Sequence, residues 1–401
     1  MKIIALLENS VTDGGGFNQT LSAIHQMQRI CKNRFEFEVF TTRPANLAIL
    51  AALDINAQLF SIGLFAKNLS MVAAMPWWQW IQYRMKRSFV MAFEKALIRQ
   101  KADLIYFVGP SFLMLPLQKL NYLSTVWDLC HRDTPEFPEV RHFSEFHVRE
   151  SLFQKTLAPS VLIITDSAMS KENISRRYGI DQDRILSIPF SPSPLLEERY
   201  AAGTPEVLAR YRIESGYFFY PAQFWSHKNH MRILDALLIL QREDWRPVMV
   251  FTGGDMGNRK TVEEFIMHNG LTDQVKILGF IPPEDMRGLY SGARAVVMPS
   301  YFGPTNLPPL EAWIMGKPLI YSTTGREQAG DAAILFDPDE AKELANALKL
   351  TRDDQLCADL IEKGRKRLQE IEVCRNIGEE KLLDRLIQFE KRCRCWGGGK
   401  E

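Results

Sequence analysis

The chain has 401 residues, of which 46% are hydrophobic and 24% charged, and its formal net charge is +1. This composition is ordinary for a folded globular protein and excludes global disorder. The near-zero charge also excludes a general attraction to nucleic acid, so any pull on phosphate or membrane must come from local patches. A chain of this length exceeds the size at which one hydrophobic core keeps growing, and we therefore expect two domains.

The six cysteines are scattered and show no zinc-type spacing, which favours a reduced, cytoplasmic setting. The apolar segment 3–7 is too short for a signal peptide and is better interpreted as a first buried strand. No run of about 18 apolar residues occurs, so the sequence predicts no membrane span.

Short apolar runs alternate with helical patterns along most of the chain. The expected strands are, in order, KIIALL, FEFEVFTT, ADLIYFV, LSTVWDL and VLIITDS, and then YFFYPA, PVMVFTGG, VKILGF, RAVVMPS and PLIYST. A stretch rich in proline, serine and glycine, at about 188–208, separates the two sets. The alternation predicts an α/β protein with two doubly wound domains facing each other across a cleft, and ligands near the carboxyl ends of the strands.

Three successive glycines follow the first expected strand and precede a helix, in TDGGGFNQTLSAI at 12–24. The backbone N–H groups of Gly15 and Gly16 could approach an anion at this helix N-terminus. The stretch is neither GxGxxG nor a P-loop, so a tight turn without a ligand is an equally good interpretation.

The segment VWDLCHRDTPEFPE, 126–139, follows another expected strand and gathers Asp128, His131, Arg132 and Asp133. Sites of α/β proteins form at the carboxyl ends of parallel strands, and a histidine there could bond a sugar hydroxyl or a developing charge. The alternative is a histidine whose bonds are satisfied by the loop itself.

Two charged residues stand out in the second half. Lys228 lies in a loop between a strand and a helix, where its charge could bind phosphate together with the helix dipole. Glu311 lies in the first or second turn of a helix that begins after Pro308 and Pro309. Its carboxylate could accept hydrogen bonds from two vicinal ribose hydroxyls, although the dipole alone also favours a glutamate there.

Together these segments resemble a glycosyltransferase of family 4, the retaining GT-B class of glycosyl transferases group 1. The family commonly reads PS-x-x-E-G-F-G-L-P-P-x-E-A-M-A-x-G-x-P-V, and this chain has PSYFGPTNLPPLEAWIMGKPLI at 299–320. Three further segments resemble the family in the same order: LIITDSAMSKENISRRYGIDQDRILSIPF, VKILGFIPPEDMRGLYSGARAVVMPS and GREQAGDAAILFDPDE. The likeness is dense from about 160 to 345 and thinner in the N-terminal half.

The resemblance implies a GT-B fold of two Rossmann-like domains and a metal-independent, retaining transfer of a hexose from a UDP- or GDP-sugar to a sugar acceptor. Charge stabilisers, and not paired carboxylates, are then expected at the reaction centre. The acceptor is expected to be a lipid-linked intermediate of a bacterial surface polysaccharide, such as O-antigen, capsule or exopolysaccharide. The implied parts are an acceptor-binding domain at 1–190, a linker at 191–208, a nucleotide-sugar domain at 209–375, and a helix and tail at 376–401 that cross back to the first domain.

The expected site residues combine these motifs with the resemblance. His131, Lys228 and Asn306 are expected at the reaction centre, and Asp128 and Arg132 near the acceptor. The residues expected to contact the donor are Gly15, Gly16, Gln223, Lys228, Gly254, Leu278, Gly303, Pro304, Thr305, Asn306, Leu307 and Glu311. No metal ligand and no cofactor are expected.

Two positions depart from the family pattern. The family's first glutamate, eight residues before Glu311, is Gly303 here, and its arginine, five residues before Lys228, is Gln223. The site therefore has one anion fewer near the sugar and one cation fewer near the diphosphate.

Three interpretations of the chain stay open, of which the first two account for these departures. The first is a variant loop in which Thr305 and Asn306 take over contacts to the sugar and the phosphate. The second is a degenerate transferase that binds nucleotide or carbohydrate without turnover. The third is a sugar-nucleotide epimerase of the same fold, against which the match to the transferase motif counts.

The stretch 64–101 combines aromatic and basic residues, most densely in PWWQWIQYRMKR. Such residues on an amphipathic helix suit peripheral contact with the inner face of an anionic membrane. The alternative is that the aromatic side chains pack the N-terminal core. No nucleic-acid partner is expected.

Overall fold

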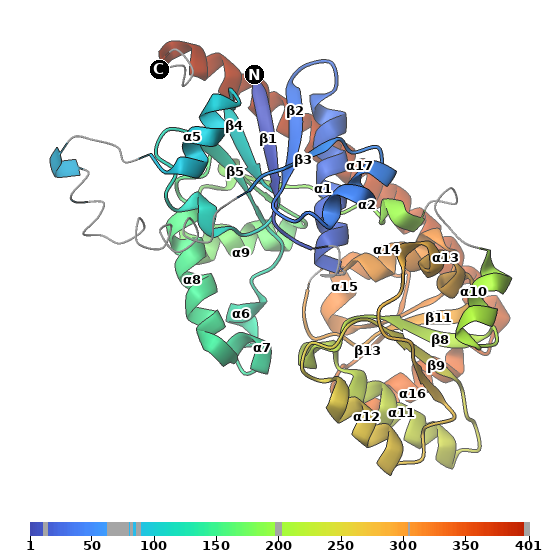
Figure 1. The fold of residues 1–401 in the computed structure, drawn as a ribbon. Helices are drawn as coiled ribbons and strands as arrows, with labels where there is room; N and C mark the ends of the chain where they lie inside the picture. The colour runs from blue at the N-terminus through green and yellow to red at the C-terminus, as the bar shows by residue number, and fades with distance from the viewer. Residues whose placement is uncertain are drawn as a thin grey trace. The chain divides into compact units, whose positions relative to one another are not determined.

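The chain folds into two compact units, each built on one parallel sheet with helices on its faces (Figure 1). The first unit contains Met1–Asp133, Phe143–Phe190 and Cys374–Glu401, and the second contains Thr134–His142 and Ser191–Val373. This computed structural model describes residues 1–10, 15–61, 80, 83–85, 90–196, 203–303 and 305–396.

The sheet of the first unit has seven parallel strands in the order β3-β2-β1-β4-β5-β6-β7. They are β1 (Lys2–Leu7), β2 (Glu36–Thr41), β3 (Ala57–Leu59), β4 (Leu104–Phe107), β5 (Asn121–Val126), β6 (Leu162–Thr165) and β7 (Ile185–Ser187). The α-helices of this part are α1 (Gly15–Cys31), α2 (Asn46–Ala52), α5 (Ala92–Arg99), α6 (Cys130–Asp133), α8 (Glu145–Thr156) and α9 (Ala168–Tyr178).

Two clusters of buried side chains lie on the same face of this sheet, since Phe107 of one cluster and Ile163 of the other are both register partners of Ser124. One cluster contains Ile4 and Leu6 of β1 and is covered by Phe93 and Leu97 of α5. The other contains Ile163 of β6 and is covered by side chains of α8 and α9. All residues of β4 and β6 are buried, which is why these strands are continuous apolar runs in the sequence.

The sheet of the second unit has six parallel strands in the order β10-β9-β8-β11-β12-β13. They are β8 (Tyr217–Pro221), β9 (Met249–Thr252), β10 (Val275–Ile277), β11 (Ala293–Met298), β12 (Leu319–Ser322) and β13 (Ile334–Phe336). Its α-helices are α7 (Pro138–Arg141), α10 (Thr204–Tyr211), α11 (His230–Arg242), α12 (Arg259–His268), α13 (Pro283–Gly292), α14 (Leu307–Ile314), α15 (Arg326–Ala329), α16 (Ala341–Leu350) and the first part of α17 (Asp354–Cys393).

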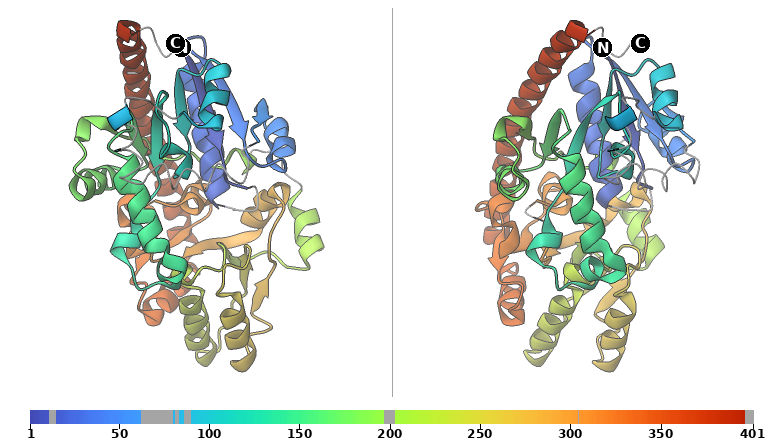
Figure 2. Two further views of the ribbon diagram at one scale, coloured as in Figure 1. Left: turned by 60° about the vertical axis from the view of Figure 1, so that its left-hand side comes forward. Right: turned by 90° about the vertical axis from the view of Figure 1, so that its left-hand side faces the viewer.

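Two segments do not follow a simple division of the chain into an N-terminal and a C-terminal half. Thr134–His142, which the sequence prediction had assigned to the first domain, packs with the second unit. The 40-residue helix α17 is continuous (Figure 2), and it belongs to the first unit from Cys374 onward. There, Glu379 pairs with Arg29 over 2.6 Å and Glu390 with the N-terminal amine over 3.2 Å.

The strand order of each sheet reverses at one place, between β1 and β4 in the first unit and between β8 and β11 in the second. The connections on the two sides of such a point leave the sheet in opposite directions, and open α/β sheets bind ligands at the carboxyl ends of these strands. The site is therefore sought in the loops that follow β8 and β11, and in those that follow β1 and β4.

The stretch 64–101, for which membrane contact was predicted, lies largely outside the described residues. The side chains of Trp80 and Tyr83 are exposed, whereas α5 buries Phe93 and Leu97 in the core. Within the part of the chain that the structure describes, no helix is both long enough and apolar enough to cross a membrane.

Gly253, at the end of β9, offers a test of the backbone that supports the site loops. Its φ is +124°, and a Cβ atom there would lie 2.5 Å from the carbonyl oxygen of Ala222. We expect Gly253→Ala to lower the free energy of unfolding by about 2–4 kcal/mol, because backbone strain and overpacking add. The neighbouring Gly254, with open space around its Cβ position, is the control. Urea unfolding measures both, and equal stabilities of Gly253→Ala and Gly254→Ala would contradict the prediction.

Candidate functional site

The loops after β8 and β11 bring Lys228 and Asn306 together in the second unit. Lys228 ends a 3₁₀ turn, Ser226–Lys228, just before α11, and Asn306 precedes the first residue of α14. The Lys228 Nζ donates a hydrogen bond to the Asn306 Oδ1 over 3.5 Å. Two of the three residues expected at the reaction centre thus meet where the strand order reverses.

The backbone around Lys228 is held from both sides. The Tyr220 hydroxyl donates to the carbonyl oxygen of Lys228 over 2.7 Å. Asn229 adopts a left-handed φ of +55°, which asparagine tolerates well, and its amide donates to the carbonyls of Pro299 and Pro338 over 3.2 and 3.0 Å. The turn is therefore tied to the ends of neighbouring strands, and the lysine extends from a fixed base.

Asn306 organises the turn after β11. Its Nδ2 donates to the Tyr321 hydroxyl over 2.7 Å and to the Gly303 carbonyl over 3.1 Å. Gln328 accepts from the Asn306 backbone N–H over 2.8 Å and donates to its carbonyl over 2.7 Å. The backbone N–H of Asn306 is therefore bonded within the protein, and the contact of Asn306 with the donor stays a prediction. Gln328 and Tyr321 were not predicted, since no motif marks residues so distant in the sequence.

The conformation of Gly303 disfavours a side chain at this position. Its φ is +89°, and a Cβ atom would lie 3.1 Å from both the Asn306 Nδ2 and the Thr305 carbonyl oxygen. A side chain at this position would strain the backbone and press on the residue that organises the turn. Pro304 lies outside the described residues. Thr305 is half-buried, and Leu307, the first residue of α14, is buried.

Glu311 is a buried carboxyl group on α14, with 6% of its surface exposed. The Tyr290 hydroxyl donates to its Oε2 over 2.5 Å. Burial raises the pKa of Glu311 to about 7, although the bond from Tyr290 works in the opposite direction. The group is thus poised between its neutral and charged forms near neutral pH. Its contact with a ribose stays a prediction.

The remaining donor residues of this unit follow three adjacent strands. Gln223, Gly254 and Leu278 come directly or almost directly after β8, β9 and β10. The indole N–H of Trp225 donates to the Gln223 Oε1 over 3.2 Å, and the Gly254 carbonyl accepts from Phe224 over 3.0 Å. These residues line the same carboxyl edge of the sheet, on the β8 side of the reversal.

In the first unit, Gly15 and Gly16 are the first two residues of α1, and 11–14 lie outside the described residues. A Cβ atom on Gly15 would have no neighbour within 4 Å, whereas one on Gly16 would lie 3.5 Å from the Asn9 amide. The Trp127 indole and Asn9 both lie close to Gly109, which follows β4. Asn9 and Trp127 thus lie together in the loops where the strand order of this sheet reverses, and neither was predicted from the sequence.

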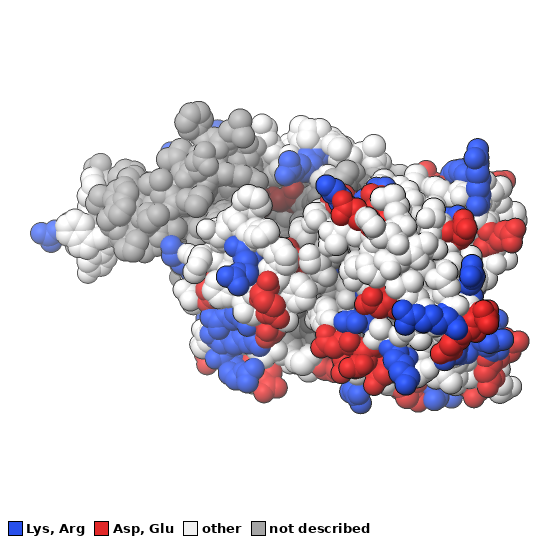
Figure 3. Space-filling view, turned by 90° about the horizontal axis from the view of Figure 1, so that it is seen from below, with Lys and Arg blue, Asp and Glu red and all other residues white. Residues whose placement is uncertain are grey.

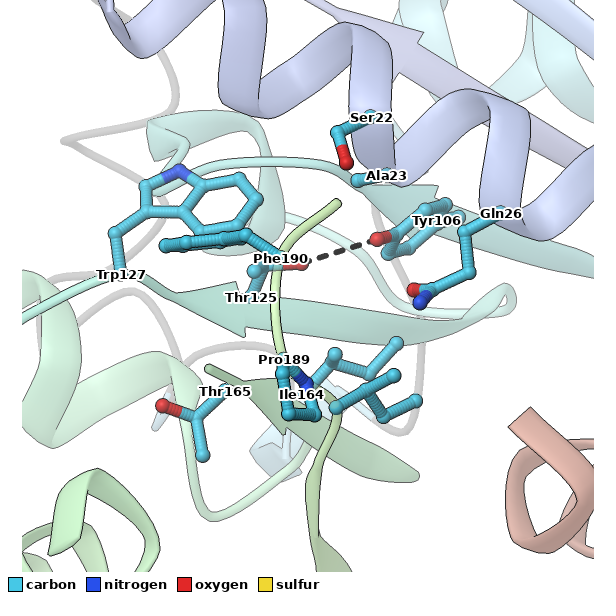
Figure 4. Close-up of a pocket in the computed structure, with 11 residues that line it drawn as sticks. Ser22, Ala23, Gln26, Tyr106, Thr125, Trp127, Ile164, Thr165, Pro189 and Phe190 are labelled. Carbon is cyan, nitrogen blue, oxygen red and sulfur yellow. Dashed lines mark hydrogen bonds between the residues drawn. The ribbon is translucent and has the colours of Figure 1, made fainter. Parts of the chain in front are cut away.

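A small hollow lies between α1 and the carboxyl ends of β5 and β6 (Figure 4). The hydroxyl of Thr125 bonds that of Tyr106 over 3.4 Å inside it, and the rings of Trp127 and Phe190 pack together with centroids 5.3 Å apart. The space is about the size of one water molecule and is too small for a sugar.

His131 is buried and does not offer a surface to a sugar. Its Nε2 lies 3.2 Å from the Glu150 Oε2, and its ring packs against Phe146 and Phe153. Burial, together with the nearby Arg149 guanidinium, holds the pKa of His131 below its usual value. Of its two ring nitrogens, only Nε2 has a hydrogen-bond partner among the described residues, and that partner comes from α8. The contact of His131 with the donor sugar stays a prediction.

Asp128 and Arg132, predicted near the acceptor, both form ion pairs. Asp128 pairs with Arg149 over 2.7 Å, and Arg132 binds both carboxylate oxygens of Glu150. The bond from Arg132 is the main cause that lowers the pKa of Glu150 to about 2. About 30% of the Asp128 side chain and 27% of the Arg132 side chain stay exposed. Their contact with an acceptor stays a prediction.

Acidic and basic side chains lie next to one another along the lower part of the face shown in Figure 3. The net charge of the whole chain is only +1, so it produces no strong overall pull on anions. Binding of an anionic ligand therefore depends on individual groups such as Lys228.

Comparison with known proteins shows what the chain is similar to. Residues 211–367 match the family model of glycosyl transferases group 1. The O-antigen chain mannosyltransferase B of Escherichia coli is 29% identical over 263 residues, which are 64% of this chain and 68% of that protein. The O-antigen chain mannosyltransferase RfbU of Salmonella typhimurium is 23% identical over 47% of this chain and 50% of its own length.

Among solved structures, HepE of Anabaena in complex with UDP and glucose superposes with a TM-score of 0.71 at 18% identity, over 95% of this chain and 99% of that chain. These likenesses confirm the predicted fold, two Rossmann-like domains of the GT-B type. The matched domain and the relatives support the predicted class of enzyme, a glycosyltransferase.

The raised pKa of Glu311 predicts a pH dependence of stability. At pH values between 4.5, the usual pKa of a glutamate, and about 7, the folded chain keeps a proton on Glu311 that the unfolded chain loses. The contribution of this carboxyl group to stability therefore falls as pH rises through this range. Glu311→Gln does not titrate. When the pH rises from 5 to 8, we expect the difference in the free energy of unfolding between Glu311→Gln and the wild-type chain to change by about 2–3 kcal/mol in favour of the variant. Urea unfolding at both pH values measures the shift, and a constant difference would contradict it.

Proposed function

We propose that this chain transfers a hexose, with retention and without a metal, from a UDP- or GDP-sugar to a sugar acceptor. The observation that carries the proposal is the approach of Lys228 to Asn306 at the reversal between β8 and β11. A cation fixed there suits the diphosphate of the donor and can stabilise the negative charge that develops on it as it leaves.

In the proposed reaction, the acceptor oxygen bonds to the anomeric carbon on the face from which the diphosphate departs. The bond between that carbon and the phosphate oxygen breaks, and the departing phosphate takes the acceptor's proton. The chain's own residues then bind and orient: Lys228 stabilises the diphosphate, the Asn306 oxygen fixes the lysine, and Glu311 accepts from the ribose.

The substrate classes are proposed from the relatives. Two of them are named as O-antigen chain mannosyltransferases, and HepE was solved with UDP-glucose as well as with UDP. We infer that the acceptor is a lipid-linked intermediate of a bacterial surface polysaccharide. A cytoplasmic location, with peripheral membrane contact through 64–101, would bring the enzyme to such an acceptor.

The geometry of the turn after β11 favours a variant loop over a degenerate site. Gly303 is fitted to its position by its φ and by its close approach to Asn306. A decayed site would have no reason to keep a turn in which Asn306, Tyr321 and Gln328 are bonded to one another. The polar groups of Asn306 replace the missing carboxylate as the organising element.

The donor site is tested by calorimetry with UDP, GDP, ADP and CMP, first without metal and then with magnesium. We expect one nucleotide to bind at micromolar concentration, with no change on adding magnesium. Lys228→Ala is expected to weaken this binding about 10- to 100-fold, because it removes the charge on the diphosphate. Lys260→Ala, a change at an exposed lysine of the same unit, is the control. Failure of all four nucleotides to bind would overturn the donor site, and binding without turnover on any acceptor would support the degenerate protein.

The variant loop is tested at Gly303. We expect Gly303→Glu, which restores the family's residue, to weaken nucleotide binding at least tenfold, because the side chain displaces Asn306. Gly216→Ala is the matched control, since Gly216 has a similar φ of +96° but open space around its Cβ position. Calorimetry and sugar transfer are measured together. Faster transfer by Gly303→Glu would show that the loop had simply lost a carboxylate.

A further inference from the structure

The segment Thr134–His142, which we call the strap, joins α6 to α8 but belongs with the second unit. It contains α7, and the chain turns sharply where the strap ends, because Phe143 and Ser144 both have left-handed backbones with φ of +54° and +61°. Phe137 and Glu139 of the strap lie against the loops that follow β8 and β11. The proposed reaction uses neither side chain directly.

One oxygen of the Glu139 carboxylate binds His227 at two points. The backbone N–H of His227 donates to the Oε1 over 2.9 Å, and the ring Nδ1 bonds the same oxygen. Only 10% of the Glu139 side chain and 12% of the His227 side chain stay exposed. Burial by itself would raise the pKa of Glu139, but the bonds from His227 outweigh it and hold the pKa below its usual value. A charged carboxylate thus restrains the residue directly before Lys228.

His227 extends this restraint to the second loop. Its ring stacks on that of Phe302 with centroids 4.1 Å apart and an angle of 8° between the planes. Its carbonyl accepts from the backbone N–H of Tyr301 over 2.9 Å. The Phe137 ring lies edge-on against Phe302, with centroids 5.1 Å apart. Because Phe302 directly precedes Gly303, the cluster ends where the organised turn begins.

We propose that Glu139 is a positioning residue of the donor site, which sets the spacing between Lys228 and the turn at Gly303 by holding His227. The inference rests on the proposed function, because it concerns the same diphosphate site. Two loops that are joined before the ligand arrives lose less conformational freedom when they bind it. Glu139 therefore acts on the phosphate groups through His227 and without touching them.

The test compares Glu139→Ala and Glu139→Gln with Glu136→Gln, a change at an exposed carboxylate of the same strap. The probes are UDP or GDP, whichever the wild-type chain binds in calorimetry, and the matching nucleoside. We expect Glu139→Ala to weaken diphosphate binding about tenfold and nucleoside binding less than about twofold, because the nucleoside lacks the phosphates. Glu139→Gln keeps an oxygen that can accept from His227 and is expected to recover most of the affinity.

The outcomes separate the inference from the proposed function. Unchanged diphosphate binding in Glu139→Ala, or an equal loss for the nucleoside, would overturn the positioning role while leaving the donor site intact. A wild-type chain that binds neither UDP nor GDP would overturn the donor site itself and the inference with it. If Glu139→Ala does not fold, Glu139→Asp takes its place, since it keeps the charge but shortens the reach. The same selective loss is then expected, and binding equal to that of Glu136→Gln would overturn the inference.

Discussion

The side chain and backbone of Asn306 together hold the turn that the second unit presents where its strand order reverses. The side-chain amide donates to Tyr321 and to the Gly303 carbonyl, and Gln328 bonds both backbone groups. A buried polar residue whose groups are satisfied in this way has one favourable conformation. Its remaining oxygen faces Lys228, so the place of the cation, the start of α14 and the glycine turn all depend on this one residue.

The two units use charge differently at the carboxyl ends of their strands. In the first unit, Asp128 and Arg132 are each paired with a residue of α8, and these pairs join α6 and the residues just before it to α8. Breaking a pair of this kind leaves a partly buried charge without its partner, so such residues stabilise the fold. In the second unit, the Lys228 Nζ bonds the amide oxygen of Asn306 where the strand order reverses. This meeting of two residues predicted for the reaction centre is why the proposed chemistry is centred on the second unit.

The buried carboxyl group of Glu311 has a structural role, and the same group is proposed to contact the ligand. Its bond with Tyr290 connects α14 to α13, whereas its burial opposes ionisation. A ligand that donates hydrogen bonds to the carboxylate would favour its charged form. The position thus couples the stability of the second unit to the proposed ribose contact.

Much of the fold could be predicted from the sequence, because short continuous apolar runs mark buried parallel strands. Each of the ten expected runs overlaps a strand of the structure. The strands that were missed, β3, β7 and β13, have three residues each and lie at the edges of the sheets. Three residues show no pattern by themselves, and β10, which is equally short, was predicted because it lies within the longer run VKILGF. In addition, β3 is partly exposed, so its side chains carry little hydrophobic signal.

The sequence by itself determined the type of fold, the loops that carry chemistry and the presence of Lys228, Asn306 and Glu311 near strand ends and helix starts. These features are local, since they depend on residues that are neighbours in the chain. Only the tertiary structure decided that His131 is buried, that Gln328 occupies the backbone of Asn306, and that Glu139 holds His227. Burial and hydrogen-bond partners are set by residues that lie far apart in the chain and meet only when it folds, 22 positions away for Gln328 and 88 for Glu139.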